Sequence, residues 1–157
     1  MSANQGEDRL FAVPKNVTET AFAPGHSRWS ASIGAIGEAR LVAELLWRGH
    51  KVARPVSDDD GVDLVVNYRT TVQVKTCARP RKVHGKSQFP HYHFNLSRPD
   101  RWLASHIDVI ALHAVDAGYW WLLPRHVIGT QKGIQVPVAA GKSFAAQWRE
   151  AWDVFDQ

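Results

Sequence analysis

The sequence predicts an α/β domain in which helices flank a central mixed sheet. One apolar helical pattern precedes a run of short strand patterns, and a second helical pattern ends the sequence. That order is typical of a sheet covered by helices. With 157 residues, 45% of them hydrophobic and 22% charged, the chain can bury a core of its own without disulfides.

The first helix is expected between Ser30 and Gly49. Ser30 or Ser32 can cap its start, and Gly49 is a typical C-terminal stop. Residues 1–27 show no sustained period and are broken by proline and glycine, so we interpret them as an N-terminal arm. The remainder, 28–157, is predicted to form a single domain.

Apolar and β-branched runs between turn-forming residues predict the strands. They lie at Val52–Val56, Val62–Asn67, Thr71–Thr76, Tyr92–Leu96, Ile107–Val115 and Tyr119–Leu123. A turn is expected at 57–61 and a short helical turn at 101–105. Aromatic residues near helical spacing predict an amphipathic helix over Ser143–Phe155.

Three polar side chains are expected to converge on one face of the hairpin formed by the second and third strands. Side chains alternate along a strand, so Gln73 and Lys75 share a face. If residues 68–70 form a three-residue loop, Asp63 lies directly opposite Lys75, and opposed residues project to the same side. A two-residue loop would shift the register by one step and separate them.

These residue types suit phosphodiester cleavage with a divalent cation. Asp63 offers the hard oxygen ligand that magnesium prefers, Gln73 a neutral carbonyl oxygen, and Glu38 a contact through water. Lys75 can hold the attacking water or stabilise developing negative charge. The alternative is that Asp63 and Lys75 form a cross-strand ion pair of structural value only. The residues alone leave both interpretations open.

Three short motifs, in this order, resemble the core of the PD-(D/E)XK nuclease superfamily. They are Gly34-Ala35-Ile36-Gly37-Glu38, Gly61-Val62-Asp63-Leu64 and Gln73-Val74-Lys75-Thr76. A helical Glu, an aspartate strand and a Q-x-K strand are most similar to the homing-endonuclease branch, and also to archaeal-type Holliday junction resolvases.

The resemblance implies a restriction-endonuclease-like fold and a metal-dependent DNA endonuclease. It implies Mg²⁺ as the cofactor, for which Mn²⁺ substitutes, held by Asp63, Gln73 and Glu38. The implied catalytic residues are Glu38, Asp63, Gln73 and Lys75.

Gln73 stands where the family usually has a second acidic residue, which removes one negative charge from the metal site. Two alternatives therefore stay open. One is a catalytically degenerate nucleic-acid-binding module of the same fold. The other is a regulatory or interaction protein without a nucleic-acid role.

The charge pattern favours an anionic partner. The formal net charge is +4, and a basic loop follows the Q-x-K strand. We expect phosphate contacts from Arg79, Arg81, Lys82 and Lys86, although a merely solvated loop is the alternative. DNA is the expected partner, and a homodimer is expected because cutting both strands needs two such sites. A single cysteine, Cys77, and the absence of a signal peptide or long apolar run predict a cytoplasmic protein that does not enter a membrane.

Overall fold

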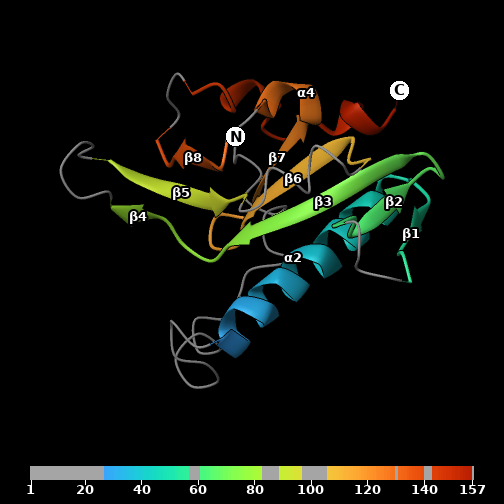
Figure 1. Cartoon of the computed structure of the whole chain (residues 1–157), viewed down its shortest axis with the longest axis horizontal. Helices are drawn as coiled ribbons and strands as arrows, with labels where there is room; N and C mark the ends of the chain where they lie inside the picture. Colours follow the sequence, from blue (N-terminus) through green and yellow to red (C-terminus); the bar gives the residue numbers. More distant parts are fainter. Residues whose placement is uncertain are drawn as a thin grey trace, which may run out of the picture.

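The computed structural model describes six ranges of the chain (Figure 1). They are 27–56, 61–82, 89–96, 106–129, 131–139 and 143–156. The expected arm, apart from Ser27, lies outside the described residues. So do the expected helical turn at 101–105 and all but the last residue of the expected turn at 57–61.

A five-stranded mixed sheet forms the centre of the fold, which confirms the predicted architecture. Its strand order is β1-β2-β3-β6-β7. The pair β3–β6 is parallel and the other neighbours are antiparallel. The strands span Val52–Ala53 (β1), Leu64–Val66 (β2), Thr70–Cys77 (β3), Val109–Ala114 (β6) and Tyr119–Pro124 (β7).

A second, three-stranded antiparallel sheet has the order β4-β5-β8. Its strands are β4 Arg81–Lys82, β5 Pro90–Asn95 and β8 Gly133–Pro137. Only β5 was expected from the sequence. The strand β4 has two residues, and β8 holds two core-facing apolar residues between a glycine and a proline, so neither gives a strong strand pattern.

The two faces of the central sheet are covered differently. The helix α2, Ser27–Trp47, lies along one face, and the second sheet lies on the other (Figure 1). The helix-side core includes Leu41, Leu45, Leu64, Val72, Val74, Ala111 and Phe155. The sheet-side core includes Tyr92, Phe94, Ile110, Leu112, Trp121, Ile134 and Val136. The short helix α4, Arg125–Ile128, contributes Ile128 to the sheet-side core.

The predicted end of the first helix is confirmed, and the predicted start is wrong. Gly49 has a φ of +86°, and the N–H of His50 donates to the carbonyl of Leu45 at 2.9 Å. The N–H of Gly49 donates to Leu46, which completes a Schellman stop. Ser30 lies inside the helix rather than before it, because serine costs little helix propensity at an exposed position.

None of the described helices is long and apolar enough to cross a membrane.

A buried histidine fixes α2 to the central sheet. Arg40 Nη1 is 3.1 Å from His113 Nε2, and His113 Nδ1 is 3.1 Å from the carbonyl oxygen of Tyr119. Burial lowers the pKa of His113 to about 4, so the imidazole is neutral near neutral pH. Its Nδ1–H therefore donates to Tyr119, and Nε2 accepts from Arg40. This contact anchors the helix two residues beyond Glu38.

Gly37 of α2 packs closely against Thr76 of β3. A Cβ added to Gly37 would lie 1.9 Å from Thr76 Oγ1 and 3.1 Å from Thr76 Cβ. We expect Gly37→Ala to destabilise the fold by about 1–3 kcal/mol, because helix and strand must separate. The matched control is Gly34→Ala, where a Cβ meets nothing within 4 Å. That change should stabilise the helix by about 0.5–1 kcal/mol. Urea unfolding measures both, and equal effects would contradict the close contact.

The expected C-terminal helix is wrong in form. The segment instead holds two 3-10 helices, η1 Ala146–Trp148 and η2 Trp152–Phe155. Glu150 interrupts them with a φ of +53°, and its backbone N–H donates to the carbonyl of Trp120 at 2.9 Å. Its carboxylate accepts from the Trp120 N–H at 2.7 Å and from Trp152 Nε1 at 2.9 Å. These contacts with the edge strand β7 replace the bonds of a continuous helix.

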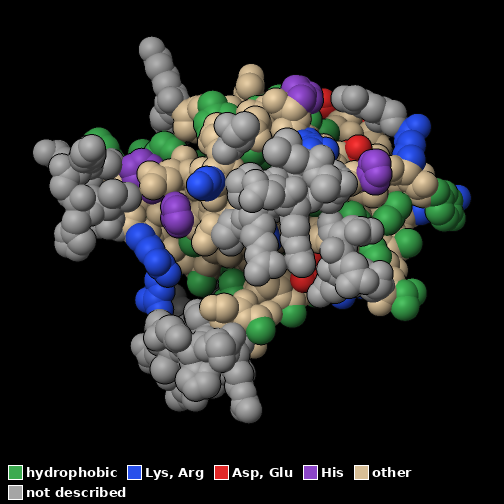
Figure 2. All heavy atoms as spheres, in the orientation of Figure 1, with side chains coloured by type: hydrophobic (Ala, Val, Ile, Leu, Met, Phe, Trp, Pro, Cys, Tyr) green, Lys and Arg blue, Asp and Glu red, His purple; other side chains and the backbone are tan. Residues whose placement is uncertain are grey.

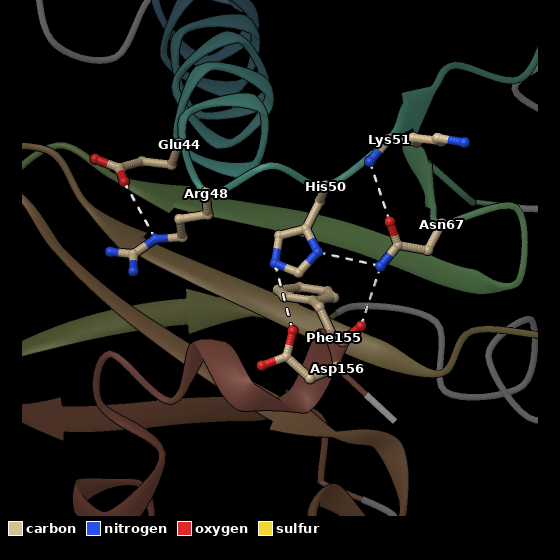
Figure 3. Close-up of polar contacts among 7 residues, drawn as sticks. All are labelled: Glu44, Arg48, His50, Lys51, Asn67, Phe155 and Asp156. Carbon is tan, nitrogen blue, oxygen red and sulfur yellow. Dashed lines mark hydrogen bonds and ion pairs between the residues drawn. The ribbon is translucent and has the colours of Figure 1, made fainter.

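Asn67 joins the β2–β3 turn to two other parts of the chain (Figure 3). Its side-chain oxygen accepts from the backbone N–H of Lys51 at 3.0 Å. Its Nδ2 donates to the Phe155 carbonyl at 3.2 Å and lies 3.1 Å from His50 Nδ1. The turn is thereby held against the end of α2 and the end of η2, which fixes the hairpin that carries the candidate site.

Candidate active site

The hairpin register differs from the predicted one by an even step. The observed pairs are Leu64↔Val72, Val65↔Thr71 and Val66↔Thr70, so the turn is 67–69 rather than 68–70. Asn67 leaves the ladder because it adopts a φ of +52°, which asparagine tolerates, and because its side chain is held by other segments. Asp63 therefore does not lie opposite Lys75. An even shift keeps the same side chains on the same face.

A β-bulge at Asp63 turns its side chain toward β3. The Asp63 N–H donates to the carbonyl of Val72 at 2.9 Å, although Val72 already pairs with Leu64. Two consecutive residues thus share one partner, which is the arrangement of a bulge. Strand alternation is broken at the same place, since Val62 packs on the sheet-side core and Leu64 on the helix-side core.

The Asp63 carboxylate occupies the position that a continued β2 would have taken. Its Oδ2 accepts the backbone N–H of Val74 at 2.6 Å. Val74 lies between Gln73 and Lys75, so this contact places the carboxylate on the Q-x-K segment. The structure therefore places the Asp63 carboxylate at the backbone between Gln73 and Lys75, through a contact that the sequence could not indicate.

Gln73 is a buried polar residue with 7% of its surface exposed. Within the described part of the chain, its Oε1 is buried and has no hydrogen-bond partner. An unpaired buried acceptor costs about 1–3 kcal/mol, which a ligand that binds this oxygen would remove. Gly61 lies against the other side of the amide, since an added Cβ there would be 3.2 Å from Gln73 Nε2. With a φ of +69°, Gly61 is also strained for any other residue.

Lys75 is half-buried and lies two residues beyond Gln73 on the same strand. Residues 73, 75 and 77 alternate toward the face that carries the second sheet, and Cys77 packs on the sheet-side core. The Lys75 ammonium and the Gln73 amide thus belong to one face of β3, as the alternation predicted.

Glu38 lies on α2, on the helix side of the central sheet. It directly follows Gly37, which abuts Thr76, the neighbour of Lys75. Its Oε2 lies 3.5 Å from Arg54 Nη1, so Glu38 forms an ion pair with this arginine, which directly follows β1. The sequence pattern did not indicate a role for Arg54, whose only signal is a basic residue at the end of a short strand.

The predicted phosphate contacts start where β3 ends. Arg79 and Arg81 are exposed, and the Cys77 thiol donates to the Arg79 carbonyl at 3.2 Å. The side chains of Lys82 and Lys86 lie outside the described residues. The two arginines follow the Q-x-K segment within six residues, which makes this end of β3 electropositive.

The donor set fits a hard divalent cation better than zinc. In the six described ranges, no three His, Cys, Asp or Glu side chains gather as a metal-binding cluster. The Asp63 carboxylate and the Gln73 amide oxygen, which is buried and has no partner in these ranges, are oxygen ligands, and Glu38 is the third oxygen ligand that the sequence predicted. Magnesium is bound by few protein ligands and keeps several waters, so this set is sufficient for it.

The chain has a mixed central sheet with a helix on one face, and a hairpin of this sheet carries an aspartate and a Q-x-K segment. These features define a restriction-endonuclease-like α/β fold. The family model for the PD-(D/E)XK endonuclease matches residues 30–155. The chain belongs to this PD-(D/E)XK endonuclease family, and it is thereby a nuclease-type hydrolase. Members of the family generally depend on divalent metal ions.

A solved structure of a bacterial homing endonuclease, I-Ssp6803I, shows the same fold. It is 22% identical with a TM-score of 0.62, covering 78% of this chain and 87% of its own. A weaker likeness is to the Holliday junction resolvase Hjc from the archaeal hyperthermophile Archaeoglobus fulgidus. That structure is 18% identical with a TM-score of 0.42, covering 68% of this chain and 84% of its own. No curated protein matches the sequence.

Proposed function

We propose that this chain is an endonuclease that hydrolyses DNA phosphodiester bonds with Mg²⁺, for which Mn²⁺ substitutes. The observation that carries the proposal is the Asp63 carboxylate at the Val74 N–H, next in sequence to Lys75 and to Gln73, whose buried oxygen has no partner among the residues described. A purely structural cross-strand ion pair would not require that buried oxygen.

The proposed roles follow from the chemistry of each group. Asp63 and Gln73 would hold the cation directly, and Glu38 would reach it through water. When bound, the cation neutralises charge on the phosphate and makes water more acidic. Lys75 would orient the attacking water and stabilise the negative charge that develops on the phosphate oxygens.

The Glu38–Arg54 pair gives Glu38 a second role in this proposal. Arg54 at 3.5 Å neutralises part of the helix carboxylate, so Asp63 is the main negative charge offered to the cation. The neutral Gln73 then keeps the net charge low, which eases the approach of an anionic phosphate.

The proposal includes the domain organisation, the assembly and the partner of the protein. The nuclease-like domain spans 28–157 after an arm at 1–27, and it acts in the cytoplasm. A cut through both strands of DNA needs two sites, so a homodimer is proposed, with DNA as its partner. Arg79, Arg81, Lys82 and Lys86 would contact phosphates beside the site.

A nicking assay tests the proposal. Purified protein is incubated with supercoiled, linear and branched DNA, with Mg²⁺ or Mn²⁺ and with EDTA. We expect metal-dependent nicking or linearisation that EDTA abolishes. Binding of DNA without cleavage in either metal would favour the alternative of a catalytically degenerate nucleic-acid-binding module. The observation behind that alternative is that Gln73 stands where the family usually has an acidic residue.

Gln73 can be tested as a ligand by changing its charge and length. Gln73→Glu should tighten Mg²⁺ binding on the order of ten-fold, because a hard cation prefers a carboxylate to an amide oxygen. Gln73→Ala should weaken binding by a similar factor. Calorimetric titration of Mg²⁺ and Mn²⁺ measures both affinities.

The matched control for this charge is Gln147→Glu, at an exposed glutamine in η1. It adds the same carboxylate outside the site and should leave the metal affinity unchanged. Equal affinities in wild type, Gln73→Glu and Gln73→Ala would place Gln73 outside the metal shell.

A further inference from the structure

The outer face of the β4-β5-β8 sheet is built from hydrogen-bonding side chains. In β5, Tyr92 and Phe94 point into the sheet-side core, so His91, His93 and Asn95 lie on the opposite side. His93 and Asn95 are exposed there, whereas His91 is half-buried. His93 is exposed, with its ring beside Gly133 of the neighbouring strand, where an added Cβ would lie 3.4 Å from Nε2.

The neighbouring strands continue this face. In β8, Ile134 and Val136 are buried and Gln135 is exposed, directly paired with His93. In β4, the exposed Arg81 is paired with His91. Paired residues project to the same side, so guanidinium, imidazole and amide groups share one surface.

The stretches of sequence that form this sheet carry basic but no acidic residues. The sequence contains no Asp or Glu from Cys77 to Pro99, the stretch that forms β4 and β5. It contains none from Ala117 to Arg149, the stretch that forms β8. On the face drawn in Figure 2, purple histidine and blue basic side chains lie together at the β4 and β5 end of the molecule. This surface is complementary to a polyanion.

We infer that the outer face of this sheet lies against the base edges of duplex DNA and determines which sequence is cut. The inference rests on the proposed function and adds the surface that reads the target. The major groove admits an antiparallel pair of strands such as β5–β8. There Gln135 can pair with adenine through its amide. Arg81, at the edge of this face, would hold the adjacent backbone phosphate. His93 lies beside Gln135 as a further donor.

The reading surface and the candidate site are joined by one short segment. Arg81 follows Lys75 by six residues, so the two are at most about 20 Å apart, or roughly six base pairs of DNA. Gln73 and Lys75 also face the side of the central sheet on which the second sheet packs. A duplex that contacts Arg81 lies within about six base pairs of Lys75, so the cut is expected close to the bases that are read.

Selection from a randomised duplex library tests the inference. Wild type, Gln135→Ala and His93→Ala are each used to recover bound duplexes in EDTA, so that no cleavage intervenes. We expect wild type to enrich a motif. Each variant should lose preference at one or two positions by about ten-fold, while the slope of log Kd against log salt stays the same. Arg81→Ala should instead lower that slope and keep the motif, because its guanidinium is proposed to contact a phosphate.

The matched controls are Gln147→Ala in η1 and His126→Ala in α4, both exposed and outside the three-stranded sheet. They should enrich the wild-type motif. The inference is overturned if wild type enriches no motif, if Gln135→Ala and His93→Ala keep the full motif, if RNA duplexes are preferred, or if sedimentation shows that Gln135→Ala changes only the oligomeric state. Metal-dependent cleavage with unchanged motifs would overturn this inference alone. A motif without cleavage would overturn the proposed function alone.

Discussion

Replacing Asp63 with asparagine is expected to reduce DNA cleavage by on the order of 10³-fold or more. The amide of the Asp63→Asn variant keeps an oxygen that can accept the Val74 N–H, which the carboxylate now accepts at 2.6 Å. The variant loses the carboxylate that the hairpin offers to a cation. The variant should lose both cleavage of supercoiled DNA and Mg²⁺ binding measured by calorimetry. Its unfolding temperature should stay close to that of the wild type.

Two comparisons make this result interpretable. Asp116→Asn removes an exposed carboxylate from the β6–β7 turn and should leave cleavage unchanged. Asp63→Ala should lose cleavage like Asp63→Asn and also lose about 1–3 kcal/mol of stability, because the Val74 N–H is left without its acceptor. Retained cleavage in Asp63→Asn would remove Asp63 from the site.

Replacing Lys75 with methionine is expected to reduce cleavage by about 10²–10³-fold while metal binding is retained. Methionine keeps the length and apolar stem of the half-buried side chain and removes its charge. The charge is proposed to act on the water and the phosphate, not on the cation. Cleavage and metal affinity should therefore separate in Lys75→Met, whereas they fall together in Asp63→Asn.

The matched control is Lys51→Met, at an exposed lysine whose ammonium lies 5.2 Å from the centre of the Tyr68 ring at the hairpin turn. It removes the same charge away from the Q-x-K segment and should cleave at the wild-type rate. A Lys75→Met protein that loses metal binding as well would show that Lys75 organises the ligands rather than the reaction.

Periodicity predicted the strands that carry the site, because their apolar alternation is strong over several residues. It also predicted that Gln73 and Lys75 share a face. The register was predicted wrongly, since Asn67 leaves the ladder to bond with residues far away in the sequence. Such a contact exists only once the fold has formed.

The remaining differences also have tertiary causes. The C-terminal segment has the aromatic spacing of a helix, yet Glu150 bonds to Trp120 on β7 and breaks it. The contact of Gly61 with the Gln73 amide depends on the path of the chain just before β2, which no local sequence pattern encodes. Short strands such as β4 owe their existence to pairing with β5 rather than to their own residues.

The bond between the Asp63 carboxylate and the Val74 N–H changes what this aspartate can tell a reader of related sequences. A related protein that lost its enzymatic activity would still be selected to keep an acceptor for the Val74 N–H. An aspartate retained at this position is therefore weak evidence of catalysis. The buried oxygen of Gln73 satisfies no donor within the described residues, so folding alone gives no reason to keep it. Changes at position 73 are therefore the more informative guide to which relatives still cut.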